Sequence, residues 1–210
     1  LMTDYLSRDD VERKASGLLR EYSRKTGKQV QPPVDVSLIG EMLCDLRWEY
    51  DLIEDPSTLA ALYPDDQVVT LNELFADRFE EVSGLHRFTK GHEVGHWMLH
   101  VDQPKRSSVP LDKAEDGDQV FCRDSADDWT EIQADWFAAG LLMPEPHLRN
   151  AVAQHRRISW SAIKSLSDSF DVSKEAMKVR LQILDLVYID DETSQIYRSK
   201  KEAEGQQNLF

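Results

Sequence analysis

The segment His92-Glu93-Val94-Gly95-His96 has the H-E-x-x-H pattern. It lies between Glu73 and His100, where the spacing of apolar residues predicts a helix with a break at Ser83-Gly84. On a helix, residues four apart project from one face, so both imidazoles can bind one metal ion at about 2.1 Å. With 6 His in 210 residues, the composition gives roughly 0.01 chance matches to this pattern. The segment therefore predicts a metal site on a buried helix.

Glu93 lies about 100° further round the helix than His92. This direction is too far displaced for an obvious third ligand, yet it lets the carboxylate reach a water held by the ion. A bound zinc ion lowers the pKa of such a water towards 7 and polarises the scissile carbonyl. We therefore expect Glu93 to be the general base of a metal-dependent hydrolysis.

A catalytic zinc also needs a third protein ligand and an open position for water. His100 lies eight residues beyond His92, about 12 Å along a helix axis, which is too far if the helix continues. Asp102 stands where the H-E-x-x-H-x-x-G-x-x-H pattern has its last ligand, but Leu99 replaces the glycine of that pattern. Glu131 is the remaining candidate, although an acidic helix start facing solvent explains this residue equally well.

Asp135 follows Glu131 by four residues and shares its helical face. There its carboxylate can accept the free ring N–H of a metal-bound histidine and fix the tautomer of that ring. One helix would then provide both a ligand and its support. A further donor should stabilise the oxyanion of the reaction, and the sequence does not rank the candidates. They are Tyr63, Arg87, His100 and His147.

Upstream of the metal motif, the sequence predicts two helices and a small sheet. Helical spacing of apolar residues runs from Ser7 to Arg24 and resumes from Val36 to Leu43. Three short β-like runs follow, and we expect them to form a small antiparallel sheet. The last run could be a sheet edge to which an extended substrate adds as a strand. The runs are Arg47 to Ile53, Leu59 to Tyr63 and Gln67 to Asn72.

Downstream of the motif, residues 102–128 are acidic with little apolar periodicity, which predicts a surface loop near the cleft. A helix that ends before Pro144 follows. A last helical pair runs from Ser159 to Val187, and Asp171-Val172-Ser173 between its members is typical of a helix-turn-helix arrangement. The charged residues between 160 and 190 give a net charge of −1, whereas a DNA-recognition unit should be basic. We expect this pair to be a scaffold or docking element.

The whole chain carries a formal charge of −14, which disfavours nucleic acid or an anionic membrane as the main partner. Without an apolar run of membrane-spanning length or a signal-peptide core, we expect a cytoplasmic protein. Its two cysteines are too few for a disulfide framework and are expected to be free thiols. We expect a peptidase core at residues 1–150, a helix-turn-helix-like segment packed on it at 151–190, and a polar tail at 191–210.

Two separated motifs resemble the ImmA/IrrE family of metallopeptidases. They are HRFTKGHEVGHWMLH at residues 86–100 and EIQADWFAAGLLMP at residues 131–144, and the resemblance extends from about Pro32 to Leu184. It implies that Glu131 is the third ligand, that the fold is a gluzincin-like α+β fold, and that the substrate is a regulatory protein, often a helix-turn-helix repressor. Asp135 departs from the asparagine that is common in the family, but its carboxylate can still accept a histidine N–H.

The sequence thus favours a regulatory zinc endopeptidase with a mainly helical, zincin-like α+β fold and a protein substrate, a repressor or an antitoxin-like protein. Zn²⁺ would be held by His92, His96 and Glu131, and such a ligand set also accepts Mn²⁺. Two alternatives stay open. One is a zinc-holding binding module that sequesters its partner without cleaving it, which the intact Glu93 disfavours. The other, less favoured, is a DNA-binding regulator.

Overall fold

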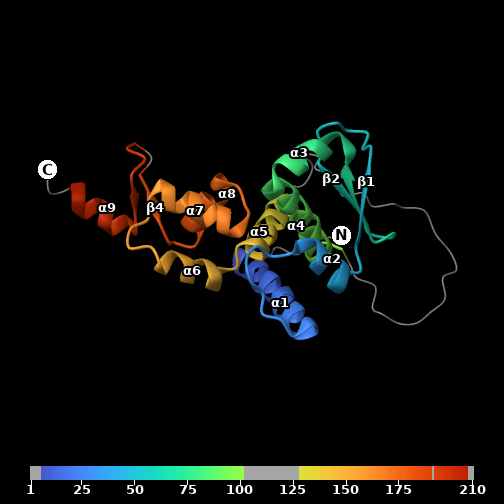
Figure 1. The fold of residues 1–210 in the computed structure, drawn as a ribbon, viewed down its shortest axis with the longest axis horizontal. Coiled ribbons are helices and arrows are strands. Elements are labelled where there is room, and N and C mark those ends of the chain that lie inside the picture. The colour runs from blue at the N-terminus through green and yellow to red at the C-terminus, as the bar shows by residue number, and fades with distance from the viewer. Residues whose placement is uncertain (1–5, 102–127, 191, 208–210) are drawn as a thin grey trace.

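The computed structural model describes residues 6–101, 128–190 and 192–207 (Figure 1). Its first helix, α1 (Arg8–Thr26), begins at a capping box in which the Ser7 hydroxyl accepts the Asp10 N–H and the Asp10 carboxylate accepts the Ser7 N–H. The helix ends at Gly27, whose φ of 69° is left-handed and suits glycine. α1 packs its apolar face against α5 (Asp128–Leu142) near the centre of the molecule.

Three strands form a mixed sheet in the order β1–β3–β2. β3 (Val68–Asn72) is the central strand and pairs in parallel with β1 (Arg47–Asp51) and antiparallel with β2 (Ala60–Tyr63). Every residue of β3 is buried, whereas β1 is mostly exposed, as expected for a central strand and an edge strand. The three strands lie within the predicted runs, but the expectation of a purely antiparallel sheet was wrong.

The predicted position of Gln67 to Asn72 at a sheet edge was also wrong. A tight turn, closed by a hydrogen bond from Gln67 N–H to the Pro64 carbonyl (3.2 Å), folds β3 back along β2. The connection between β1 and β2 leaves a gap that β3 then fills. Residues near the turn determine the β2–β3 hairpin, whereas the order of the three strands depends on the longer connection between β1 and β2. Because both edges of β3 are paired, an extended substrate cannot add to this strand.

The metal motif lies on α4 (Ser83–Leu99), with α2 (Val36–Cys44) packed against it. η1 (Glu73–Phe75) and α3 (Ala76–Glu81) precede α4. The helix break lies at Val82, next to the predicted position, where φ of −125° and ψ of 78° leave the helical region. Among the described helices, α4 and α5 share the most extensive contact, and Figure 1 shows them side by side in the middle of the molecule.

The C-terminal helices lie on the side of α4 and α5 opposite to the sheet (Figure 1). The predicted boundary at residue 150 falls within the first of these helices, and the range 191–210, predicted as a polar tail, includes a strand and a helix. The elements are α6 (Glu145–Ala153), α7 (Trp160–Phe170), α8 (Lys174–Ile183), β4 (Tyr188–Ile189), β5 (Ile196–Tyr197) and α9 (Lys200–Gln207).

The turn between α7 and α8 packs against the start of α4. Asp171 ends α7 with a φ of 52°, and its carboxylate accepts hydrogen bonds from the Ser83 hydroxyl and from Arg87 Nη1, the latter at 2.9 Å. Gly84 lies so close to this turn that a Cβ there would be 3.2 Å from its backbone. The helix-turn-helix-like pair therefore uses its turn for a contact within the molecule, as a scaffold element would.

The fold is α+β and mainly helical, as the sequence predicted. Its apolar core extends from α1 and the sheet through α4 and α5 to α7 and α8. No helix within the described ranges combines the length and the apolar character that a membrane span requires. Cys44 is a buried free thiol, and burial raises its pKa to about 12, so it stays protonated. Cys122 lies outside the described residues.

Arg180 is a fully buried side chain that joins three parts of the helical core. From α8 its Nε and Nη2 donate to the carbonyl of Met143, between α5 and α6, at 3.2 and 3.1 Å. The same guanidinium pairs with Glu12 of α1, with Nη2 3.0 Å from Oε2. Since a buried charge is costly without its counter-ion, the Glu12 carboxylate should contribute strongly to stability.

We expect Glu12→Gln to lower the free energy of unfolding by about 3 kcal/mol, because it leaves the Arg180 charge buried without an anion. Urea unfolding followed by circular dichroism measures this change. The matched control is Glu21→Gln on the same helix, which removes the exposed partner of Arg24 and should cost about 0.5 kcal/mol or less. Equal losses in the two variants would contradict the role given to Glu12.

Candidate metal centre

Three side chains from two helices converge between α4 and α5. Nε2 of His92 lies 2.9 Å from Nε2 of His96, and each nitrogen lies 3.1 Å from one carboxylate oxygen of Glu131. Both histidines are buried, and Glu131 is partly buried. Two ligands about 2.1 Å from a tetrahedral ion lie roughly 3.4 Å apart, so this triangle has nearly the dimensions that a metal site requires.

Asp135 contacts the outer nitrogen of the first histidine. Its Oδ1 lies 2.8 Å from Nδ1 of His92, one helical turn beyond Glu131 on α5. A carboxylate only accepts hydrogen bonds, so Nδ1 of His92 carries the proton and the neutral ring directs the Nε2 lone pair toward Glu131. The side chain that the sequence suggested as a support for the ligands thus lies at hydrogen-bonding distance from one of them.

The second histidine has a different support, which the sequence reasoning missed. Nδ1 of His96 lies 3.2 Å from Nδ1 of His100, and Nε2 of His100 lies 3.0 Å from Oε1 of the buried Gln133. Burial lowers the pKa of His100 despite the opposing hydrogen bond with Gln133, so its neutral ring can accept the Nδ1 proton of His96 and donate its own proton to Gln133. The four-residue spacing of the two histidines was the available sequence signal.

The donor set fits a divalent cation. With both outer nitrogens protonated, two Nε2 lone pairs and a carboxylate face each other at about 3 Å, an arrangement that a cation stabilises. Partial burial raises the pKa of Glu131, but His92 and His96 lower it well below its usual range when their Nε2 atoms are protonated, and a cation held by the Nε2 lone pairs would act in the same direction. The Glu131 carboxylate is therefore ionised at neutral pH and can act as a ligand.

Glu93 occupies the position beside this cluster that the helix geometry requires of a base. It follows His92 directly on α4 and is 3% exposed. A buried carboxylate is costly unless neighbouring groups compensate its charge, and a cation held by the adjoining ligands would do so. The geometry thus combines three metal-ligand atoms with a neighbouring buried carboxylate.

The structure brings together only some of the side chains considered from the sequence. Arg87 points to other partners, since it pairs with Asp171 and donates to the Val34 carbonyl at 2.7 Å. His100 contacts His96 and does not join the three ligand atoms. Tyr63 ends β2 and His147 lies on α6, so neither belongs to the two helices of the cluster. Of the predicted acidic loop at 102–128, with Asp102 as a considered ligand, all but Asp128 lies outside the described residues.

Two glycines of α4 allow α5 to approach closely enough to form this cluster. A Cβ at Gly95 would lie 3.0 Å from both the Cα and the carbonyl oxygen of Ala134, and 3.2 Å from the Cβ of Phe137. A Cβ at Gly91 would lie 3.3 Å from the Cβ of Ala138. Since backbone atoms of α5 stand against Gly95, any larger residue there must push the helices apart.

We expect Gly95→Ala to lower the free energy of unfolding by about 2 kcal/mol through overpacking, and to weaken metal binding because Glu131 moves away from the histidines. Thermal unfolding and a metal titration measure the two effects. Gly17→Ala is the control, because its Cβ would meet only the flexible end of Arg20 at 3.8 Å and alanine favours the helix by up to about 1 kcal/mol. A Gly95→Ala protein as stable as the control variant would refute this account of the packing.

Comparison with known proteins adds a family to this geometry. Residues 81–182 match the family model of the IrrE N-terminal-like domain, Peptidase_M78. The match includes all of α4 and α5 and extends nearly to the end of α8. A comparison with curated proteins gave no match. Residues 81–182, which carry the His92, His96 and Glu131 cluster, thus form a domain similar to the IrrE N-terminal-like domain of the ImmA/IrrE family of metallopeptidases.

Proposed function

We propose that this protein is a zinc-dependent endopeptidase whose metal ligands are His92, His96 and Glu131. The observation that carries the proposal is the convergence of two Nε2 atoms and one carboxylate within about 3 Å, next to the buried Glu93. Two imidazoles and one carboxylate form a common ligand set of catalytic zinc in peptidases, and Mn²⁺ is the second candidate for the same donors. When bound, the ion polarises the scissile carbonyl and makes water a stronger nucleophile.

The protein's own residues would move the protons of the reaction. Peptide hydrolysis adds a hydroxyl to the carbonyl carbon, breaks the C–N bond and gives a proton to the leaving amine. The Glu93 carboxylate would accept the proton of the attacking water and deliver it to the amine nitrogen. Asp135 would hold the His92 ring in one tautomer, and the His100–Gln133 pair would do the same for His96.

A regulatory protein is the substrate that we propose, with a helix-turn-helix repressor or an antitoxin-like protein as the candidate. This part of the proposal follows from the family resemblance and from the charge of −14, which favours a protein partner over nucleic acid. The α7–α8 turn contacts α4 through Asp171 and Arg87, which disfavours DNA recognition by this pair. The proposed setting is cytoplasmic, in keeping with a regulatory target.

Replacing Glu93 by Gln should abolish cleavage while leaving metal binding within about threefold of the wild type, because the amide keeps the side-chain shape but cannot take the proton. Cleavage is followed by mass spectrometry of new N-termini in a purified helix-turn-helix repressor, chosen from the reading frames that adjoin the gene for this chain. Parallel samples contain zinc, a chelator, or the exposed control variant Glu80→Gln. Undiminished cleavage by Glu93→Gln would exclude the proposed base, and partner binding without any wild-type cleavage would favour the sequestering module.

Metal affinity should fall in a defined order when the centre is altered. Glu131→Ala removes a ligand and should weaken zinc binding by more than about 100-fold. Asp135→Ala and Gln133→Ala leave all three ligands in place. Each removes a hydrogen-bond partner, of His92 or of His100, and should weaken zinc binding by roughly 10-fold to 100-fold. Competition with a chromogenic chelator measures all three variants. An affinity unchanged in Glu131→Ala would exclude this residue as the third ligand.

A further inference from the structure

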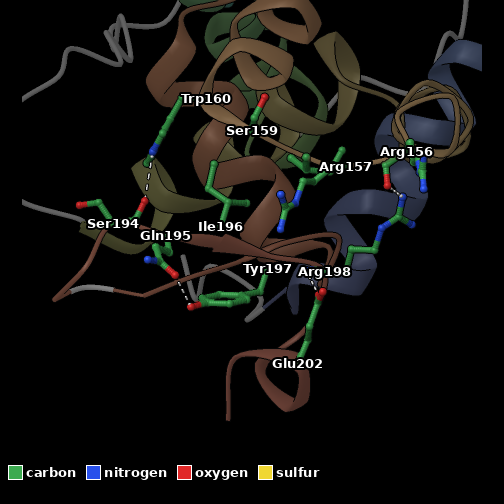
Figure 2. Close-up of a pocket in the computed structure, with 11 residues that line it drawn as sticks. Arg156, Arg157, Ser159, Trp160, Ser194, Gln195, Ile196, Tyr197, Arg198 and Glu202 are labelled. Atoms are coloured by element: carbon green, nitrogen blue, oxygen red, sulfur yellow. Dashed lines mark hydrogen bonds between the residues drawn. The ribbon is translucent and has the colours of Figure 1, made fainter. Parts of the chain in front are cut away.

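A concave site lies in the C-terminal part of the chain, away from the metal centre. Its volume is about 830 Å³, within the range of roughly 300–1,000 Å³ typical of ligand pockets. The loop between α6 and α7 forms one wall, and β5 with the start of α9 forms the other (Figure 2). Its lining includes Arg156, Arg157, Ile158, Trp160, Ile196 and Arg198.

Three arginines and one glutamate give this pocket a net formal charge of +2, in a chain whose total is −14. Arg198 holds the wall together, because its Nη2 donates to the carbonyls of His155 (2.7 Å) and Arg156 (3.0 Å). Glu202 accepts the backbone N–H of Arg198 at 2.8 Å. Figure 2 shows the guanidinium of Arg157 directed into the space between the two walls.

Neither Arg156 nor Arg157 has a carboxylate partner among the described residues, whereas six of the twelve described arginines do. Both are exposed. An unpaired guanidinium in a concave site keeps its capacity to bind a carboxylate with two parallel hydrogen bonds. The arginines that do pair with an acidic side chain are Arg13, Arg24, Arg47, Arg87, Arg149 and Arg180.

The rest of the lining combines apolar and aromatic residues with Ser159, Ser194 and Gln195. Ile158 is buried beneath it, and Ile196 is partly buried. Trp160 is held by a hydrogen bond from Nε1 to the Ser194 carbonyl (3.1 Å), and Lys174 lies 4.9 Å from its ring, which adds another cation near the rim. Such a surface suits carboxylates interspersed with apolar side chains. A nucleic-acid backbone would instead need an extended basic face and would be repelled by the remaining surface.

We propose that this pocket binds an acidic segment of a polypeptide partner, with Arg156 and Arg157 as the carboxylate-binding residues. This assignment of the partner rests on the proposed function. The pocket would bind the protein substrate at a distance from the bond that is cleaved. Trp160 of the pocket begins α7, and Asp171 at the other end of α7 contacts α4, so α7 connects the pocket to the helix that carries the metal motif. Binding energy from such a remote contact increases the effective concentration of the substrate at the metal centre.

Fluorescence anisotropy with a short labelled peptide of glutamates interspersed with leucines tests this proposal, and the same peptide with glutamines is the reference. We expect the glutamate peptide to bind at least about tenfold more tightly than the glutamine peptide, and its binding to weaken with salt. The double variant Arg156→Glu and Arg157→Glu should lose at least about tenfold in affinity. The uncharged pair Arg156→Gln and Arg157→Gln should show an intermediate loss.

Arg20→Glu and Arg24→Glu form the matched control, because they change the net charge by the same amount at exposed positions of α1 outside the pocket. They should alter the affinity for the peptide less than about twofold. Circular dichroism verifies that each variant is folded. Binding should persist in the presence of a chelator, so a failed peptidase assay does not affect this result. Equal affinity for both peptides, equal losses in the control, or tighter binding of a labelled DNA oligonucleotide that depends on the same arginines would each overturn the proposal.

Discussion

The close approach of α4 and α5 is the constraint on which the metal centre depends. Gly91 and Gly95 place no side chain of α4 at the contact, so Ala134 and Ala138 of α5 lie directly against this helix. Only at this separation can a carboxylate on one helix lie 3.1 Å from ring nitrogens on the other. The glycine inside the H-E-x-x-H segment is therefore as important for the site as the residues that would contact the ion.

α5 supports both histidines, but by two different routes. Asp135 reaches His92 directly, whereas Gln133 reaches His96 through the ring of His100. In both cases the outer nitrogen is engaged, so the inner nitrogen is directed to the same point. A single helix thus combines a candidate ligand with the groups that orient the other two, which makes the geometry sensitive to any shift of α5.

Ion pairs and hydrogen bonds connect the C-terminal helices to the helices around this centre. Arg87 and Asp171 link the α7–α8 turn to α4, and the buried Arg180 links α8 to α1 and to the end of α5. These contacts give the helix-turn-helix-like pair, whose residues 160–190 carry a net charge of −1, a role within the fold.

The sequence by itself determined the features that depend on neighbouring residues. The shared face of His92 and His96, the adjacent Glu93 and the mainly helical content all follow from periodicity within single segments. From its residues alone, Glu131 could equally be part of a solvent-facing acidic helix start until the family resemblance favoured it as a ligand, because nothing local to α5 indicates which helix it will meet. Tertiary structure alone decided the central position of β3, the link from Gln133 to His100 and the arginine pocket. Each of these depends on distant segments that pack together, and a pattern within one segment specifies which face is buried but not what covers it.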